Sequence, residues 1–167
     1  INGFEVDGHD YIKQAIEAGA KAIVVDNVKK IKKEDVNESI TIIAIPDTRI
    51  GLAKIACNFY GNPSQKFNLV GITGTKGKTT TTFMIKSILE KQGKKVGLIG
   101  TIATYIGDKK LEDSARTTPE STKLQKIFSM MVEQNVEVVV MEVSSQSLKL
   151  NRVAGCDFDI GVFTNFS

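Results

Sequence analysis

A glycine-rich loop carries the strongest chemical signal in this sequence. It reads Gly-Thr-Lys-Gly-Lys-Thr-Thr over residues 74–80, between an apolar run that predicts a strand and a stretch that predicts a helix. Glycines let backbone N–H groups turn toward an anion, and a helix N-terminus adds the positive end of its dipole. Lys78 can reach the outer phosphates of a nucleotide, and the hydroxyl of Thr79 can coordinate Mg²⁺. The pattern predicts a phosphate-binding loop.

This loop departs from the common nucleotide-hydrolase pattern, which has glycine six places before the lysine. Ile72 occupies that place here, and the nearby glycines are Gly71 and Gly74. We therefore expect a compact variant of the loop. The alternative is a glycine-rich turn with unrelated lysines, but the flanking strand and helix both favour phosphate binding.

A carboxylate follows the most apolar stretch of the chain. Glu142 comes directly after Val-Val-Val-Met at residues 138–141, which predicts a strand buried in a parallel sheet. In proteins with a phosphate-binding loop, a carboxylate at the end of a neighbouring strand binds the Mg²⁺ of the nucleotide. An acidic residue in this position is often structural, but with the loop present we favour the metal role.

Hydroxyl groups and arginines lie near the ends of the predicted strands, where open α/β sheets bind ligands. Ser144 and Arg152 suit an anionic substrate, although spacing alone favours a helix cap for the serine and a surface position for the arginine. Thr117 and Thr118 precede Pro119, so they are expected to cap a helix, and an anion at that helix N-terminus is the functional alternative.

The remaining reactive residues predict no site. His9 is the only histidine, and we expect it to be structural because no second histidine or nearby cysteine completes a metal site. Cys57 and Cys156 fit no metal or redox spacing, so we expect buried thiols.

Strand and helix patterns alternate along the chain, which predicts an α/β fold with a mostly parallel sheet. A Gly-Asn-Pro-Ser turn at residues 61–64 suggests a boundary between a first domain, residues 1–62, and a second, residues 63–167. The predicted strands cover residues 22–25, 41–45, 69–73, 95–100, 136–143 and 158–163, with a hairpin arm at 102–106, and the predicted helices lie near 11–18, 48–59, 78–92, 119–131 and 147–153. Residues 27–39 are polar and lysine-rich, and we expect a loop or a poor helix there. The helix at 48–59 is expected to turn Leu52, Ile55, Ala56 and Phe59 inward, and the helix at 119–131 has an apolar stripe of Leu124, Ile127, Phe128 and Met131.

Composition excludes several classes of protein. The 167 residues are 41% apolar with a formal net charge of +3, which argues against disorder and gives little support for nucleic-acid binding. We find no signal peptide, no membrane-spanning stretch and no internal repeat. Because the sequence starts at Ile1 without methionine and stops at Ser167, just after an apolar run, we expect a fragment of a longer protein.

Four motifs together resemble the Mur ligases. They are Gly-Thr-Lys-Gly-Lys-Thr-Thr-Thr at 74–81, Thr-Thr-Pro-Glu at 117–120, Met-Glu-Val-Ser-Ser at 141–145 and Val-Phe-Thr-Asn at 162–165. The stretch Gly-Phe-Glu-Val-Asp-Gly-His-Asp at 3–10 also resembles the end of the first domain of that family. The resemblance covers essentially the whole chain and is strongest to the branch that adds the third residue of the peptidoglycan stem peptide.

The resemblance implies an ATP-dependent amide ligase of cell-wall synthesis that adds L-lysine or meso-diaminopimelate to UDP-MurNAc-L-Ala-D-Glu through an acyl phosphate. It implies a catalytic Lys78, with Thr79 and Glu142 as ligands of Mg²⁺. The residues it assigns to ATP are Gly74, Thr75, Lys76, Gly77, Lys78, Thr79 and Thr80, and those it assigns to the UDP-muramoyl-dipeptide are Thr117, Thr118, Ser144 and Arg152.

Three positions depart from the family pattern. Lys76 stands where asparagine is usual, Gln146 where histidine is frequent, and Leu150 where some members have a substrate-binding glutamine. The resemblance also implies further segments before and after this sequence, among them a metal-binding histidine, a carbamylated lysine and the amino-acid-binding domain. We therefore expect the fragment alone to bind nucleotide weakly without ligating.

Other functions remain open from the sequence. One alternative is another Mur-type or a folylpolyglutamate-type ligase, and another is a non-catalytic nucleotide-binding protein. A phosphate-loop switch protein would need a water-positioning residue and switch segments that the sequence does not show. For the ligase we expect a cytoplasmic monomer, with no nucleic-acid partner and no membrane insertion.

Overall fold

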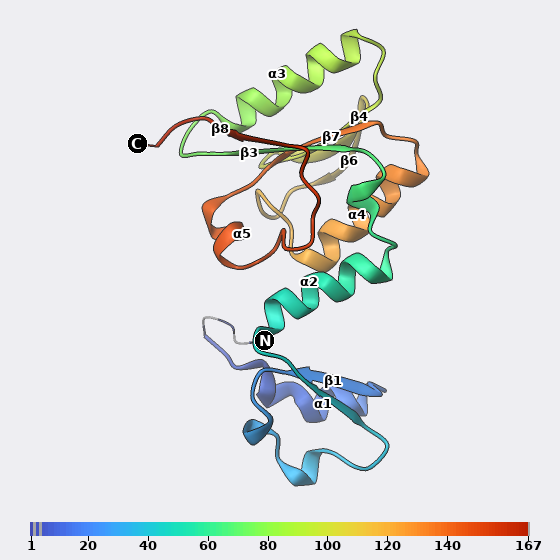
Figure 1. Ribbon diagram of the computed structural model, residues 1–167, viewed down its shortest axis with the longest axis vertical. Helices are drawn as coiled ribbons and strands as arrows, with labels where there is room; N and C mark the ends of the chain where they lie inside the picture. The colour runs from blue at the N-terminus through green and yellow to red at the C-terminus, as the bar shows by residue number, and fades with distance from the viewer. Residues whose placement is uncertain (2, 4, 167) are drawn as a thin grey trace. The chain divides into compact units, whose positions relative to one another are not determined.

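The computed structural model describes residues 1, 3 and 5–166. Phe4, which is part of the stretch that resembles the family's first domain, and Ser167, where the sequence stops, lie outside the described residues. The chain divides into two compact units, Ile1–Gly51 and Leu52–Ser167 (Figure 1). This division falls inside helix α2 (Thr48–Phe59), and the boundary expected between residues 62 and 63 stays a prediction.

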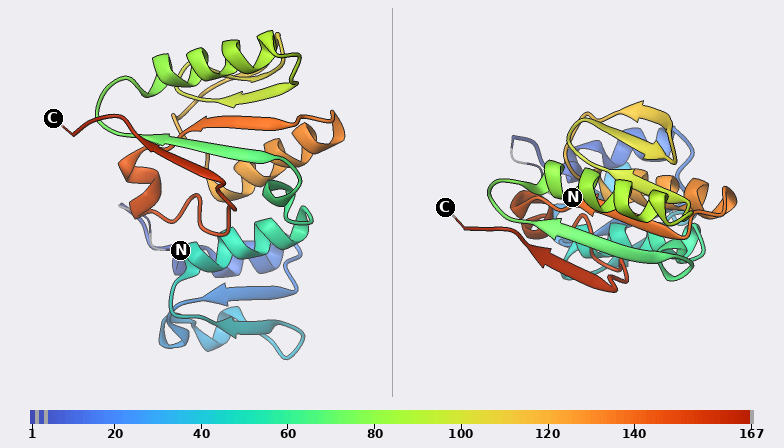
Figure 2. Two further views of the ribbon diagram at one scale, coloured as in Figure 1. Left: turned by 45° about the horizontal axis from the view of Figure 1, so that its top comes forward. Right: turned by 90° about the horizontal axis from the view of Figure 1, so that it is seen from above.

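The second unit is built on a six-stranded sheet with the order β6-β5-β4-β7-β3-β8. Four neighbouring strands, β4, β7, β3 and β8, run parallel, and β5 and β6 add an antiparallel hairpin at one edge (Figure 2). The predicted α/β fold with a mostly parallel sheet is confirmed. The strands are β3 (Asn68–Thr73), β4 (Val96–Ile99), β5 (Ala103–Ile106), β6 (Lys109–Asp113), β7 (Val138–Glu142) and β8 (Ile160–Phe163).

Helices cover both faces of this sheet. Helix α3 (Lys78–Lys91) lies on one face and α4 (Ser121–Glu133) on the other (Figure 1). The predicted apolar stripe of α4 is confirmed, because its members are almost completely buried: Leu124, Ile127, Phe128 and Met131. The valines and isoleucines of the inner strands alternate between the two cores, as the pleat of a sheet requires. A short helix, α5 (Ser145–Lys149), follows β7, two residues earlier than predicted.

The face of α2 that the sequence predicted is partly wrong. Ile55 and Phe59, expected on its inner face, are 51% and 79% exposed, while Ala53, Ala56 and Cys57 are buried. The helix turns its small residues inward, where they allow close approach of the backbone. The thiol of Cys57 lies 3.5 Å from the carbonyl oxygen of Gly155. Both cysteines are free, and burial raises the pKa of the Cys156 thiol to about 12.

The first unit pairs two parallel strands, β1 (Ala22–Val25) and β2 (Thr41–Ala44), with helix α1 (Ile12–Glu17). The lysine-rich segment between the strands forms the short 3-10 turns η2 (Val28–Lys30) and η3 (Lys33–Asp35), which agrees with the first of the two alternatives, a loop or a poor helix.

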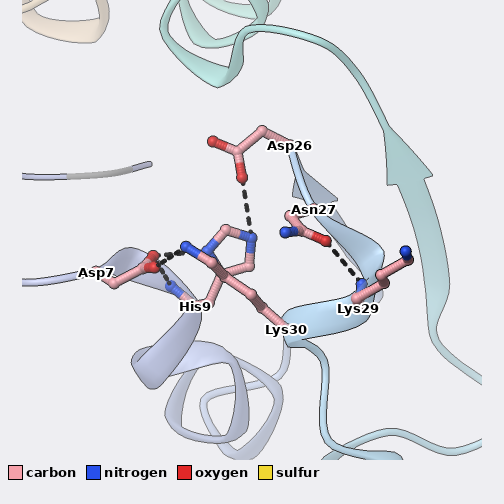
Figure 3. Close-up of polar contacts among 6 residues, drawn as sticks. All are labelled: Asp7, His9, Asp26, Asn27, Lys29 and Lys30. Atoms are coloured by element: carbon pink, nitrogen blue, oxygen red, sulfur yellow. Dashed lines mark hydrogen bonds and ion pairs between the residues drawn. The ribbon is translucent and has the colours of Figure 1, made fainter.

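His9 sits in a polar network of the first unit, shown in Figure 3. Its Nδ1 lies 2.6 Å from the carboxylate of Asp7, and its Nε2 lies 3.2 Å from the carboxylate of Asp26. Lys30 also pairs with Asp7, and that hydrogen bond, together with those from His9, holds the pKa of Asp7 well below its usual range. His9 is buried within this network, which agrees with the structural role expected from the sequence.

Parallel strands bring their following loops to one edge of the sheet. Ile72 of β3 is in register with Glu142 of β7, and Ile99 of β4 is in register with Met141. The glycine-rich loop, Glu142 and the residues after β4 therefore lie together. In the described part of the chain, no helix is both long and apolar enough to cross a membrane.

Candidate active site

The glycine-rich loop joins β3 to α3 and takes a conformation that needs its glycines. Gly74 has φ of +129° and Gly77 has φ of +84°, which side-chain-bearing residues rarely adopt. A Cβ on Gly74 would also lie 2.2 Å from the hydroxyl oxygen of Thr164. The loop thus turns directly into the helix, as the sequence predicted.

Thr164 and Asn165, which follow β8, hold this loop in place. The carbonyl oxygen of Asn165 accepts from the N–H of Thr75 at 3.0 Å, and its side chain exchanges hydrogen bonds with the backbone of Lys76. The hydroxyl of Thr164 donates to the carbonyl of Lys76 at 2.8 Å. Sequence reasoning assigned no role to Thr164 or Asn165, although both belong to the Val-Phe-Thr-Asn motif.

The start of α3 presents the anion-binding groups. Because the first N–H groups of a helix have no partner within it, those of Lys78, Thr79 and Thr80 point toward the loop. The ammonium of Lys78 donates to the carbonyls of Gly74 at 2.7 Å and Thr75 at 3.2 Å, which places its charge over the loop. This arrangement suits a phosphate group.

Glu142 ends β7 beside the loop and is only 1% exposed. Its Oε2 accepts from the hydroxyl of Thr79 at 3.0 Å and from the hydroxyl of Thr101 at 3.0 Å. Its Oε1 accepts from the backbone N–H of Thr101 at 2.9 Å. All three donors are neutral, and among the described residues no cationic side chain forms an ion pair with this carboxylate.

Sequence reasoning missed Gly100 and Thr101, which follow β4. A Cβ on Gly100 would lie 2.4 Å from Oε1 of Glu142, so only glycine leaves the carboxylate its place. The sequence signal for these two residues was a glycine and a threonine after an apolar strand, which is a common pattern. Their contact with Glu142 could not be predicted, because Glu142 lies far away in the sequence.

The two predicted threonines differ in their surroundings. Thr118 is fully buried, and its hydroxyl donates to the carbonyl of Glu142 and accepts from the N–H of Ser144. The hydroxyl oxygen of Thr117 lies 3.1 Å from that of Thr101. Neither threonine caps α4, whose N-cap is Glu120 without a side-chain cap bond, so that prediction is wrong. The hydroxyl of Thr118 is occupied in joining this segment to the end of β7.

Arg152 is buried, which corrects the surface position that spacing favoured. It is 5% exposed, donates to the carbonyl of Thr118 at 3.2 Å and pairs with the carboxylate of Glu120 at 2.9 Å. Glu120 also accepts from Arg116 at 2.6 Å. The cap expected for Ser144 is confirmed, because its hydroxyl accepts from the N–H of Ser147 at the start of α5.

The residues present fit a magnesium nucleotide. No group of three or more His, Cys, Asp or Glu side chains that could hold a metal exists among the described residues. Mg²⁺ bound with a nucleotide needs only one or two protein oxygens, because phosphate oxygens and waters complete its coordination. Glu142 and Thr79 supply a carboxylate and a hydroxyl within 3.0 Å of each other, next to the anion-binding loop.

Comparison with protein families agrees with this geometry. Residues 72–167 match the Mur ligase middle domain, and residues 1–60 match a model described as the Mur ligase family, catalytic domain. The chain belongs to the Mur ligase family. The resemblance inferred from the four motifs is thereby confirmed.

Curated Mur ligases match over the whole chain. The UDP-N-acetylmuramoyl-L-alanyl-D-glutamate–2,6-diaminopimelate ligase of Clostridium tetani is 53% identical over 167 residues, which is 34% of its own length. The ligase of the same name from Clostridium perfringens is 54% identical over 169 residues, 33% of its length. The chain therefore spans about a third of the length of these relatives.

A solved structure shows the same fold. The structure of a UDP-N-acetylmuramoyl-L-alanyl-D-glutamate–2,6-diaminopimelate ligase superposes with a TM-score of 0.77 at 22% identity, over 95% of this chain and 31% of that one. At this identity the likeness supports the α/β fold of a Mur ligase and adds nothing about individual site residues.

Proposed function

We propose that the complete gene product containing this chain is an ATP-dependent amide ligase of peptidoglycan precursor synthesis. It joins the amine of a diamino acid to UDP-MurNAc-L-Ala-D-Glu. The D-Glu carboxylate of that substrate attacks the γ-phosphate of ATP, ADP leaves, and the amine then displaces phosphate from the acyl phosphate. The names of the relatives that match the whole chain support 2,6-diaminopimelate as the diamino acid.

One observation carries this proposal within the structure. Glu142 is a buried carboxylate held by three neutral donors, beside the hydroxyl of Thr79 at the start of a glycine-rich phosphate loop. Burying a charge without an opposite charge is costly. A cation between this carboxylate and the loop would offset that cost, and Mg²⁺ with ATP brings such a cation.

The loop and Lys78 serve the phosphates in this proposal. Residues Gly74 to Thr80 surround the ATP phosphates, with N–H groups at the start of α3 as donors. Lys78 is the catalytic residue, because its ammonium offsets charge on the transferred phosphoryl group. Bound Mg²⁺ supplies further charge stabilisation, and Thr79 and Glu142 are the residues that would hold it.

We assign the muramoyl-dipeptide site to four residues at the same sheet edge, three of them as contacts and one as a support. Thr117 and Ser144 are half-buried and can present oxygens to the substrate, and Arg152 offers a guanidinium whose Nε has no hydrogen-bond partner among the described residues. Thr118 is fully buried, so we expect it to support Thr117 and Ser144 from behind. We expect this enzyme to act as a monomer in the cytoplasm, where its soluble substrates are found.

The test is a ligation assay with the complete gene product, ATP, Mg²⁺ and UDP-MurNAc-L-Ala-D-Glu. ADP release is expected with meso-diaminopimelate and at least tenfold less with L-lysine at equal concentration. Release without any dependence on the muramoyl-dipeptide would refute the proposal. Equal or faster ligation of L-lysine would refute only the choice of diamino acid.

A further inference from the structure

We propose that Thr101 is a positioning residue of this active site. It fixes the carboxylate of Glu142 through two hydrogen bonds and orients the hydroxyl of Thr117. The inference rests on the proposed function and deepens it, because it connects the residues assigned to Mg²⁺ with those assigned to the muramoyl-dipeptide.

The direction of these hydrogen bonds follows from counting protons. A threonine hydroxyl has one proton to donate and two lone pairs to accept with. An ionised carboxylate only accepts, so at 3.0 Å the hydroxyl of Thr101 must donate to Oε2 of Glu142. The 3.1 Å contact between the hydroxyls of Thr101 and Thr117 then requires Thr117 to be the donor.

This order has a consequence for the substrate. The hydroxyl of Thr117 donates its only proton to Thr101, so it can only accept a hydrogen bond from a ligand. We therefore expect an N–H or O–H group of the muramoyl-dipeptide at Thr117, and not a carboxylate or phosphate oxygen. The hydroxyl of Thr101 thus connects Glu142, assigned to Mg²⁺, with Thr117, assigned to the muramoyl-dipeptide.

The backbone at Gly100 and Thr101 also helps to hold the carboxylate of Glu142 in place. Its N–H donates to Oε1 of Glu142 at 2.9 Å, and Gly100 leaves room for that same oxygen. Both carboxylate oxygens are therefore fixed by one residue, and rotation of the carboxylate breaks at least one bond. Hydrogen bonds to a metal ligand of this kind set its orientation and affect metal affinity.

The experiment compares Thr101→Val, Thr101→Ser and wild type in the complete gene product. Valine keeps the shape and the backbone N–H but removes the hydroxyl, and serine keeps the hydroxyl. The readout is calorimetric binding of a non-hydrolysable ATP analogue, AMPPNP, at increasing Mg²⁺ concentration. We expect the Mg²⁺ concentration for half-maximal binding to rise about tenfold in Thr101→Val, the lower end of the usual cost of losing such a partner.

Thr101→Ser is expected within about threefold of wild type, which separates the hydroxyl from the general packing of the side chain. Thr41→Val, at an exposed threonine of β2, is the matched control and should leave the Mg²⁺ requirement unchanged. A Thr101→Val protein whose Mg²⁺ requirement stays within twofold of wild type would overturn the inference. Absence of any Mg²⁺-dependent AMPPNP binding in wild type would instead overturn the proposed function.

Discussion

Two carboxylates of this protein are held in opposite ways. Asp7 in the first unit is bound by the ammonium of Lys30 and by the imidazole of His9, so its negative charge is already paired. Glu142 in the second unit is more deeply buried, yet its three donors are two hydroxyls and a backbone N–H. The charge of Asp7 is paired within the protein, whereas among the described residues no cationic side chain pairs with the carboxylate of Glu142.

This difference separates a structural network from a candidate active site. Both clusters contain residues that a motif search would consider, including the only histidine of the sequence. The deciding feature is whether each charge has a partner, because a buried charge that is paired within the protein needs no ligand to balance it. By that criterion we propose Glu142, and not His9, as part of the ligand site.

Glu142→Gln is expected to have the largest effect. The amide keeps the size of the side chain but removes its charge, and an amide nitrogen would face hydroxyls that now donate. Because a bound metal supplies several kcal/mol of charge stabilisation, ADP release in the ligation assay should fall by about 10²–10³-fold. The melting temperature without ligands should change little, because removal of the unpaired buried charge is offset by the amide N–H₂ group, which faces the donors of Thr79 and Thr101. Activity within threefold of wild type would contradict the metal role.

Gly100→Ala is expected to have an intermediate effect. The new Cβ would meet Oε1 of Glu142, the end of a side chain that can move aside, so the fold should survive. The displaced carboxylate should then raise the Mg²⁺ requirement for AMPPNP binding about tenfold. Gly161→Ala is the matched control, because nothing lies within 4 Å of a Cβ at that strand position. Equal Mg²⁺ requirements in the two variants would show that Gly100 has no part in the site.

Asp7→Asn is expected to leave the Mg²⁺ requirement unchanged and to alter stability alone. The pKa of Asp7 is lowered by the hydrogen bond from Lys30, so its charged form stabilises the folded state. That contribution is fully present above the pKa of an unfolded aspartate, about 3.9, and is lost as pH falls through the lower folded value. Asp7→Asn should therefore melt at a lower temperature than wild type at pH 7.

The difference in melting temperature should narrow below about pH 4, where wild type also begins to lose the charge. Thermal unfolding followed by circular dichroism between pH 3 and 8 measures it. A melting-temperature difference that grows toward acid would contradict the sign of the shift. If Asp7→Asn also changed Mg²⁺-dependent AMPPNP binding, Asp7 could not be a purely structural carboxylate in contrast to Glu142.

Local patterns predicted much of this molecule. The glycine loop between strand and helix and the stripe from Leu124 to Met131 follow from nearby residues, because the turn chemistry and the helical period are encoded over a few positions. The placement of Glu142 at the end of a buried strand also followed from the apolar run before it.

Features that depend on distant contacts were missed or wrong. Thr101 and Asn165 matter because strand order brings them to Glu142 and to the loop, and no local pattern shows that order. Arg152 looked like a surface residue because its partners, Thr118 and Glu120, are far away in the sequence. The buried face of α2 was misplaced because small residues, rather than the largest apolar ones, face its neighbours.

The most direct test of the central claim is to locate the metal. Crystals of the complete gene product grown with AMPPNP and Mn²⁺, an ion that gives anomalous scattering, would show its position. We predict one ion within coordination distance of both the Thr79 hydroxyl and the Glu142 carboxylate, bridging to the phosphates on the loop. A nucleotide bound on the loop with its metal away from Glu142, or a nucleotide bound elsewhere, would contradict the account.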